Sequence, residues 1–392
     1  MNGRSILVGV LGLAIGFAIV RDSFVTAYAR SDPERAASVW PDHPRVMVSQ
    51  ALTDIGIAAV KRRPPPQVAL NRIAQAGHLS PLGHDAFMVR GITAQQEGDF
   101  RLAEQAFTAA RRRAPREAGP RYFLSELYIR SGREAEGLGE LAMLARLLPN
   151  GPASVAPSLA AYARTARSLR ELKASFRNHP ELEQAVLLEL AHDPANADLA
   201  VGLAGKTHLS DGSAPEWVRR LIPNLAEAGQ FDRAYRLWSA SGGSQSRGAI
   251  FDPGFRGSAA LPPFNWTFRS DSAGFAEADG RGGLHVLFYG RDDAVLASQT
   301  LLLAPGSYRL AMAVAGNPVG MLRWTLTCLP AKQEIAVLPL VTGVGASPAV
   351  DFSVARGCAA QSLELHGDAG DVPTQADITV SALKLSGVDN AQ

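Results

Sequence analysis

Two cysteines are the residues of this chain whose chemistry is most easily placed. Cys328 and Cys358 are the only cysteines among 392 residues, and both lie in the last third. No second Cys or His stands near either one at metal-ligand spacing, so no metal ion or cofactor is expected. A disulfide between them is the favoured interpretation, and two unpaired buried thiols are the alternative.

A second set of residues has the chemistry to contact a sugar. His285 and Tyr289 alternate with apolar Val286 and Phe288, so they face either solvent or a concave sheet. Sugar rings stack on aromatic faces and hydrogen-bond to polar neighbours, which makes Trp266, His285 and Tyr289 candidate glycan contacts. The alternative is structural, with Trp266 in the core and the other two exposed.

Patterns typical of enzymes fail on inspection. The run Ala200-x4-Gly205-Lys206-Thr207 fits a relaxed phosphate-binding loop, but such a loop must follow a strand, and 195–204 is Ala-rich and helical. Gly205 is better explained as the end of a helix. Neither His-Glu-x2-His nor Gly-x-Ser-x-Gly occurs. The chain is therefore expected not to be an enzyme.

The elements that position these residues begin with a 34-residue period in the first half of the chain. A Gly-Asp-Phe turn at 98–100 is followed by a helix in which small and large apolar residues alternate at fixed spacing. The positions that carry the pattern are Ala69, Ile73 and Pro81 in one copy, Gly91, Gly98, Ala103, Phe107, Ala110 and Pro115 in the next, and Leu124, Tyr128, Gly132, Leu141 and Pro149 in the third.

This period of helix, tight turn and helix resembles the tetratricopeptide repeat (TPR), most clearly over 50–151. The resemblance implies antiparallel helix pairs that stack and leave a concave groove for a peptide or a partner helix. Beyond 151 the helices are expected near 155–168, 168–178, 181–192 and 195–206. The segment 230–238 then repeats the turn and the second helix, out of register with the strict period.

The N-terminus predicts export. Fifteen uncharged, mostly apolar residues run from Ile6 to Val20, somewhat short of the ~20 that span a membrane comfortably. An uncleaved signal anchor is favoured because Arg21 and Asp22 follow at once and the helix pattern continues. The alternatives are a signal peptide cleaved after Ala27-Tyr28-Ala29 and a merely buried helix.

From residue 250 onward the apolar period changes from 3.6 to 2, which predicts an antiparallel β-sandwich. Strands are expected at 284–289, 295–303, 308–314, 322–328, 335–341, 350–354, 361–366 and 377–385. Residues 304–307 are expected to form a hairpin turn between the second and third of these. Trp324 shares a strand face with Leu326 and Cys328 and is expected in the core. The frame from Phe251 to Tyr308 resembles jelly-roll modules grouped with galactose-binding-like and carbohydrate-binding domains.

These observations predict a multidomain α + β chain with six sections. They are a signal anchor at 1–22, a connecting helix at 23–45, TPR-like repeats at 46–240, a flexible linker at 241–249, a β-sandwich at 250–387 and a tail at 388–392. The linker is expected to decouple the helices from the sandwich.

Charge is modest and unevenly distributed. The net charge of +2 divides into +6 over the first 248 residues and −4 over the rest, with no concentrated basic face, so no nucleic-acid partner is expected. The order anchor, TPR array, sandwich resembles bacterial inner-membrane proteins of exopolysaccharide systems. That resemblance implies a single-pass inner-membrane scaffold with most of the chain in the periplasm and a protein partner in the groove. The alternative is a membrane-tethered module whose sandwich binds polysaccharide.

Overall fold

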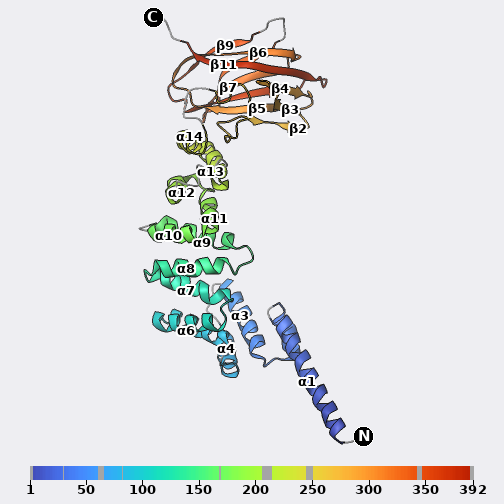
Figure 1. Ribbon diagram of the computed structural model, residues 1–392, viewed down its shortest axis with the longest axis vertical. Coiled ribbons are helices and arrows are strands. Elements are labelled where there is room, and N and C mark those ends of the chain that lie inside the picture. Colours follow the sequence, from blue (N-terminus) through green and yellow to red (C-terminus); the bar gives the residue numbers. More distant parts are fainter. Residues whose placement is uncertain are drawn as a thin grey trace. The chain divides into compact units, whose positions relative to one another are not determined.

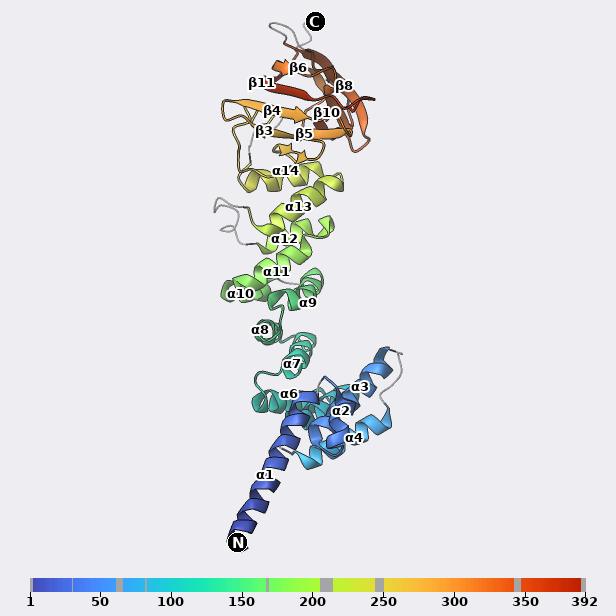
Figure 2. The same ribbon diagram turned by 90° about the vertical axis from the view of Figure 1, so that its right-hand side faces the viewer.

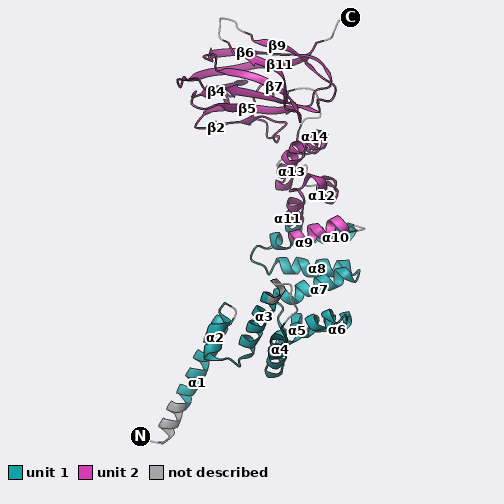
Figure 3. Ribbon diagram, turned by 180° about the vertical axis from the view of Figure 1, so that it is seen from behind, with its two compact units in different colours: residues 1–155, 168–182 teal, residues 156–167, 183–392 magenta. Residues whose placement is uncertain are grey.

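A computed structural model describes residues 3–29, 31–60, 66–81, 83–166, 169–204, 214–243, 250–341 and 347–388 (Figure 1). Within them, an α-helical region is followed by antiparallel sheets, as the periodicity predicts. Two of the motifs above lie outside the described residues: Gly205-Lys206-Thr207, and most of the linker, 244–249. The chain forms two compact units, residues 1–155 with 168–182, and residues 156–167 with 183–392 (Figure 3).

Helices make up the first unit and begin the second. The first contains α1 (Gly3–Tyr28), α2 (Pro33–Val39), α3 (Pro44–Val60), α4 (Gln67–Leu79), α5 (His84–Gln96), α6 (Phe100–Arg113), α7 (Ala118–Arg130), α8 (Glu134–Ala145) and α10 (Arg170–Asn178). Both α9 (Pro152–Thr165) and α11 (Pro180–Leu190) contribute to the two units. The second unit continues with a 3-10 turn (Pro194–Asn196), α12 (Ala197–Leu203), α13 (Glu216–Glu227) and α14 (Phe231–Ala240). Instead of a separate connecting helix at 23, α1 continues unbroken to Tyr28.

The 34-residue period is visible in the helices themselves. Helices α5 and α7 begin 34 residues apart, and so do α6 and α8. The turn inside each pair contains a glycine with positive φ, +83° at Gly98 and +79° at Gly132, a conformation that glycine adopts without steric cost. The turn between α13 and α14 has the same form, with Gly229 at φ +71°. These three pairs are helical hairpins of one kind, although the last is out of register.

Close approach within a hairpin depends on one small residue facing one large residue. Gly91 on α5 leaves no room for a Cβ, because the ring of Phe107 on α6 occupies that space. Phe107 is completely buried, with Leu124 and Tyr128 of α7 in the same cluster. The other helical positions of the repeat pattern, Ala69, Ile73, Ala103, Ala110 and Leu141, are also buried.

The second unit ends in two facing antiparallel sheets (Figure 1). Their strands are β1 (Thr267–Phe268), β2 (Ser270–Asp271), β3 (Gly274–Ala278), β4 (Gly283–Phe288), β5 (Ala294–Leu301), β6 (Gly306–Asn317), β7 (Leu322–Leu329), β8 (Gln333–Pro339), β9 (Ala349–Val354), β10 (Ala360–Gly367) and β11 (Ala376–Gly387). One sheet has the order β1-β5-β10-β7-β8 and the other β2-β3-β4-β11-β6-β9. Buried Trp324, Phe288 and Leu363 belong to the core of the sandwich, as expected for Trp324.

The predicted hairpin at 304–307 is wrong. Strand β5 pairs with β1 and β10, whereas β6 pairs with β11 and β9, so residues 302–305 cross from one sheet to the other. A buried amide guides this crossing, since the Leu303 backbone N–H donates to Oε1 of Gln361 at 2.8 Å. Pro305 and Gly306 therefore lie where the chain passes from one sheet to the other, and they do not form a hairpin turn.

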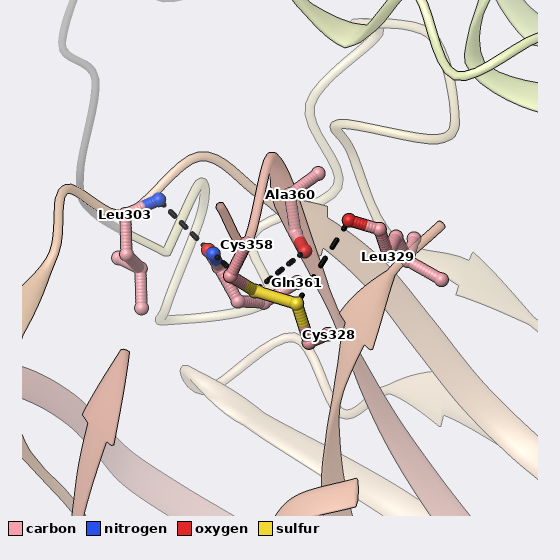
Figure 4. Close-up of a disulfide and its surroundings, with 6 residues drawn as sticks. All are labelled: Leu303, Cys328, Leu329, Cys358, Ala360 and Gln361. Carbon is pink, nitrogen blue, oxygen red and sulfur yellow. Dashed lines mark hydrogen bonds between the residues drawn. A yellow bond between two sulfur atoms is a disulfide. The ribbon is translucent and has the colours of Figure 1, made fainter. Parts of the chain in front are cut away.

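The two cysteines form a disulfide between neighbouring strands. Cys328 lies near the end of β7 and Cys358 precedes β10, with their Cα atoms 5.5 Å apart (Figure 4). Nε2 of Gln361 lies 3.3 Å from Sγ of Cys358. The bond thus closes the end of the β7–β10 pair, in agreement with the predicted disulfide.

Contacts within the second unit correct the expectation that the last helix and the sandwich are decoupled. Nε1 of Trp238 on α14 donates to the backbone oxygen of Leu261 at 2.8 Å. Its ring lies 5.1 Å from that of Phe251 and 5.6 Å from that of Phe264, centroid to centroid. Oε1 and Nε2 of Gln299 on β5 in turn hold both backbone polar groups of Phe251. The strap 250–266 therefore joins α14 to the sheet.

Candidate functional site

A groove in the first unit is lined by the first helices of three successive helix pairs, α3 with α4, α5 with α6 and α7 with α8. Helices α3, α5 and α7 each contribute residues from their N-terminal half or from the position just before it. The cavity has a volume of about 510 Å³, and its lining residues are Thr26, Ala29, Arg45, Val48, Ser49, Leu52, His84, Asp85, Glu117, Gly119 and Pro120. Because Thr26 and Ala29 lie at the end of α1, the N-terminal helix forms part of the groove wall.

The groove combines an apolar surface with charges of both signs. Leu52 is 50% exposed although it is a large apolar residue. Nη1 of Arg45 donates to Oγ1 of Thr26 at 3.1 Å, and Nε2 of His84 lies 3.2 Å from Oδ1 of Asp85. A smaller hollow of about 140 Å³ shares Arg45, Val48, His84 and Asp85 with it.

Two sets of ion pairs, one around buried Glu140 and one around more exposed Arg133, connect the helices beside the groove. Glu140 on α8 is paired with Arg111 of α6 and with Arg121 of α7, whose Nη1 lies 2.8 Å from Oε2 of the carboxylate. Arg133, in the turn before α8, binds both carboxylate oxygens of Glu104 and also Glu136. A hydrogen bond from Arg133 lowers the pKa of Glu136. These ion pairs hold α6, α7 and α8 together, and the start of α7 is part of the groove wall.

The end of α1 packs against the helices that follow it in the first unit, which we call the head (α2 to α8 and α10). Val25 and Ala29 are 0% and 2% exposed, and they pack with Ala36 of α2 and Val46 of α3. The helix is also long and apolar enough to cross a membrane, judged by length and composition over a window from Leu11 to Tyr28 that includes Val25, and a signal sequence passes the same test. The sequence pattern therefore located the apolar stretch but did not reveal that the end of the same helix is buried.

The turn after α2 packs against the same helix. Nε2 of His43 lies 3.6 Å from Oδ1 of Asp22. Burial lowers the pKa of His43, an effect that the Asp22 carboxylate partly opposes.

The sugar candidates are separated by the fold. Trp266 is only 6% exposed, and its ring packs on Phe255 and Trp324, so it lies in the core. His285 lies on the outer face of the six-stranded sheet, where its Nε2 is 3.0 Å from Oδ1 of Asp377 on β11. Tyr289 follows one residue after the end of β4 and is half-buried.

Several site residues were not found from the sequence. Asp377 becomes the partner of His285 only because β11 pairs with β4, 92 residues away along the chain. Phe275 on β3 is a further neighbour, with its ring 5.4 Å from that of His285. The groove residues Arg45, Leu52 and Asp85 carry no signal of their own, because the repeat pattern marks the packed side of each helix and not its open side.

Comparison with known proteins gives distant similarity in structure. No family model and no curated protein matches the chain. A chain of the Glycosylation Associate Protein complex from Streptococcus agalactiae matches 32% of this chain and 44% of its own length, less than half, at 14% identity and TM-score 0.24. YrrB, described as a TPR protein with an unusual peptide-binding site, matches 54% of this chain and 91% of its own at 14% identity and TM-score 0.29. TmCBM61, solved with β-1,4-galactotriose, matches 36% of this chain and 100% of its own at 16% identity and TM-score 0.25. Because these scores are low, we derive function from this chain's own geometry.

Proposed function

We propose that this chain is a non-catalytic, single-pass inner-membrane scaffold that works in cell-envelope or exopolysaccharide assembly. Its groove would hold a segment of a partner protein on the periplasmic side. The observation that carries the proposal is the groove itself, which α3, α5 and α7, the first helices of three successive helix pairs, line together. Stacked helical repeats bind partners on such a surface, where each repeat adds side chains to one continuous wall.

The size and lining of the groove favour a peptide segment over a folded domain. Its volume of about 510 Å³ lies in the range of pockets that hold a small ligand or a few side chains, roughly 300–1,000 Å³. The exposed side chain of Leu52 offers apolar contact, while Arg45 and Asp85 offer charges of opposite sign. A partner segment with one apolar anchor between polar residues matches this surface.

The proposed membrane attachment is supported by the pattern of exposed and buried residues along α1. Its apolar residues from Leu11 to Val20 are exposed, whereas Val25 and Ala29 belong to the core of the head. Cleavage after Ala29 would remove both of these residues from their cluster. Retention of α1 as an anchor leaves that cluster intact, and it places the groove wall next to the membrane attachment.

Site-specific photo-crosslinking tests the groove. A photoreactive amino acid at Leu52 should give a discrete crosslinked product in cells, because this position lines the groove. The matched position is Leu79 at the end of α4, which is 55% exposed and does not line the groove. Crosslinking of equal strength at both positions, or at neither, would refute the proposal.

A second candidate function, glycan binding, is favoured by the outer face of the six-stranded sheet. There, Phe275 presents a half-buried ring beside His285, and the carboxylates of Glu277 and Asp377 flank the imidazole. An aromatic face bordered by hydrogen-bonding groups is a surface on which a sugar ring can stack. Titration with a panel of oligosaccharides should then show binding that Phe275→Ala removes, whereas an unchanged titration would exclude this face.

A further inference from the structure

Helix α2 runs back along α1 toward the apolar end of that helix. Where α2 begins, beside the C-terminal end of α1, the Arg35 guanidinium lies 4.5 Å from the ring centroid of Tyr28. Where α2 ends, the Arg21 guanidinium lies 4.1 Å from the ring centroid of Trp40, and Nε of Arg21 donates to the backbone oxygen of Val39 at 3.2 Å. The eight residues from Arg21 to Tyr28 are separated by seven steps, which span about 10 Å of helix. The chain therefore returns by that distance and turns at the level of Arg21. Figure 2 shows α2 beside the end of α1 that lies away from the N-terminus.

The level of Arg21 is the end of the apolar stretch. Leu13, Phe17 and Val20 are 78%, 69% and 69% exposed, so no part of the described head covers this face of α1. The uncharged run from Ile6 to Val20 extends about 22 Å along the helix at 1.5 Å per residue, which is shorter than the ~30 Å hydrocarbon thickness of a bilayer. If α1 spans the membrane, Arg21 lies where hydrocarbon gives way to headgroups.

We propose that the turn following α2 is a second membrane contact, with the Trp40 side chain lying among the lipid headgroups. This inference rests on the proposed membrane anchoring of α1. Val39 is 36% exposed and Trp40 is half-buried, so apolar surface remains available at this level. Tryptophan is enriched at membrane interfaces, because its ring is apolar and its N–H can bond to water or headgroups.

Neighbouring charges fit the same location. Arg21 stacks on the Trp40 ring, and a guanidinium at this depth can reach lipid phosphates while its stem stays in apolar surroundings. Asp22 is held by His43, whose ring makes an edge contact with Trp40 at 4.9 Å between centroids. With α1 and this turn both in the membrane, the groove beside them would be held in one orientation to the bilayer.

Fluorescence quenching by brominated lipids tests the contact. The chain has five tryptophans, and the other four, Trp217, Trp238, Trp266 and Trp324, are at most 6% exposed. The full chain in vesicles with phospholipids brominated at a shallow acyl position should lose up to about a fifth of its tryptophan emission, the share of one residue among five. Lipids brominated near the acyl terminus should quench less.

The variant Trp40→Phe provides the control, because it keeps an aromatic ring in the turn. It should remain bound to vesicles, retain its far-ultraviolet circular dichroism and show no lipid quenching. If the wild-type chain resists alkaline carbonate extraction but is not quenched, the Trp40 contact is refuted while the anchor stands. If carbonate releases the chain, the anchor and the contact are both refuted.

Discussion

At the scale of single residues, Phe107 shows how much one side chain contributes to the repeats. It fills the space beside Gly91 and is completely buried between α5, α6 and α7. Phe107→Ala should therefore lower the free energy of unfolding of the helical region by about 3–5 kcal/mol. Urea unfolding followed by far-ultraviolet circular dichroism measures this. Phe100→Ala on the same helix is the control, since Phe100 is 54% exposed and its loss should change stability by about 0.5 kcal/mol or less.

Glu140 allows a similar test of a buried charge. Its side chain is 9% exposed and pairs with Arg121, which is 13% exposed. Glu140→Ala leaves that guanidinium without its carboxylate in a buried site, which should cost about 3–5 kcal/mol. Glu126→Ala, which removes an exposed pair with Arg130, should cost about 0–1 kcal/mol. Equal effects in the same urea experiment would show that the Glu140 pairs do not hold the hairpins together.

These two residues also show what a sequence can reveal at this scale. Phe107 is marked by its place in a 34-residue pattern, because each copy of the repeat must fill the same gap. Glu140 has no such mark, since its partners come from α6 and α7 and depend on how the hairpins stack. The groove residues Leu52 and Asp85 cannot be recognised in the sequence for a related reason. The repeat pattern reflects packing on the buried face of each helix, whereas these two residues lie on the face that lines the groove.

At the scale of elements, periodicity located the eight strands from β4 to β11, because each alternates buried and exposed residues. It missed β1 and β2, which have two residues each, and β3, which begins with Gly274 and carries no long apolar run. It also could not assign strands to sheets. The connection at 302–305 contains residue types that favour a tight turn within one sheet. The same residue types occur here where the chain passes from one sheet to the other.

The strap between α14 and the sandwich leads to a prediction about folding units. A chain beginning at Ala214 retains the Trp238 contacts, and one beginning at Ile250 lacks them. The shorter chain should be less stable by at least the 0.5–1.5 kcal/mol of a typical hydrogen bond, shown by faster hydrogen exchange of the β5 and β10 amides. Identical exchange in the two chains would restore the expectation of a decoupling linker.

The disulfide should stabilise the sandwich without serving a binding site. Cys328 and Cys358 are separated by 30 residues, and closing such a loop is worth roughly 3–4 kcal/mol in the chain-entropy model. The double substitution Cys328→Ser and Cys358→Ser should lower the free energy of unfolding of the sandwich by that amount. Binding at the groove or at the β3–β4–β11 face should be unchanged. Non-reducing digestion and mass spectrometry establish the linkage, and two freely alkylated thiols would contradict it.

At the scale of the whole molecule, the proposed anchor, the groove and the sandwich would each have a different role in the proposed scaffold. The first unit contains both α1 and the groove, so the proposed membrane anchor and the proposed partner site belong to one folded body. The second unit contains the sandwich with its own candidate surface around His285. A protein of this kind can hold a partner near the membrane while a separate surface contacts a different ligand.

The last prediction concerns the fate of the N-terminus. Small residues at Ala27 and Ala29 offer a cleavage pattern, but Val25 and Ala29 are buried against α2 and α3. Burial of a valine side chain is worth about 1.5–3 kcal/mol, and its removal would also expose Ala36 and Val46 to water. Selection for a stable head therefore opposes cleavage there.

The protein purified from membranes should accordingly retain residues 1–29 by intact mass, and alkaline carbonate should leave it in the membrane fraction. Val25→Asp should destabilise the head, because it places a charge in an apolar cluster. Ser23→Asp is the matched control, since Ser23 is exposed two positions earlier on the same helix and does not line the groove. A soluble form that begins at residue 30 and is as stable as the full chain would show that α1 is a signal peptide and that the burial of Val25 does not contribute to the mature fold.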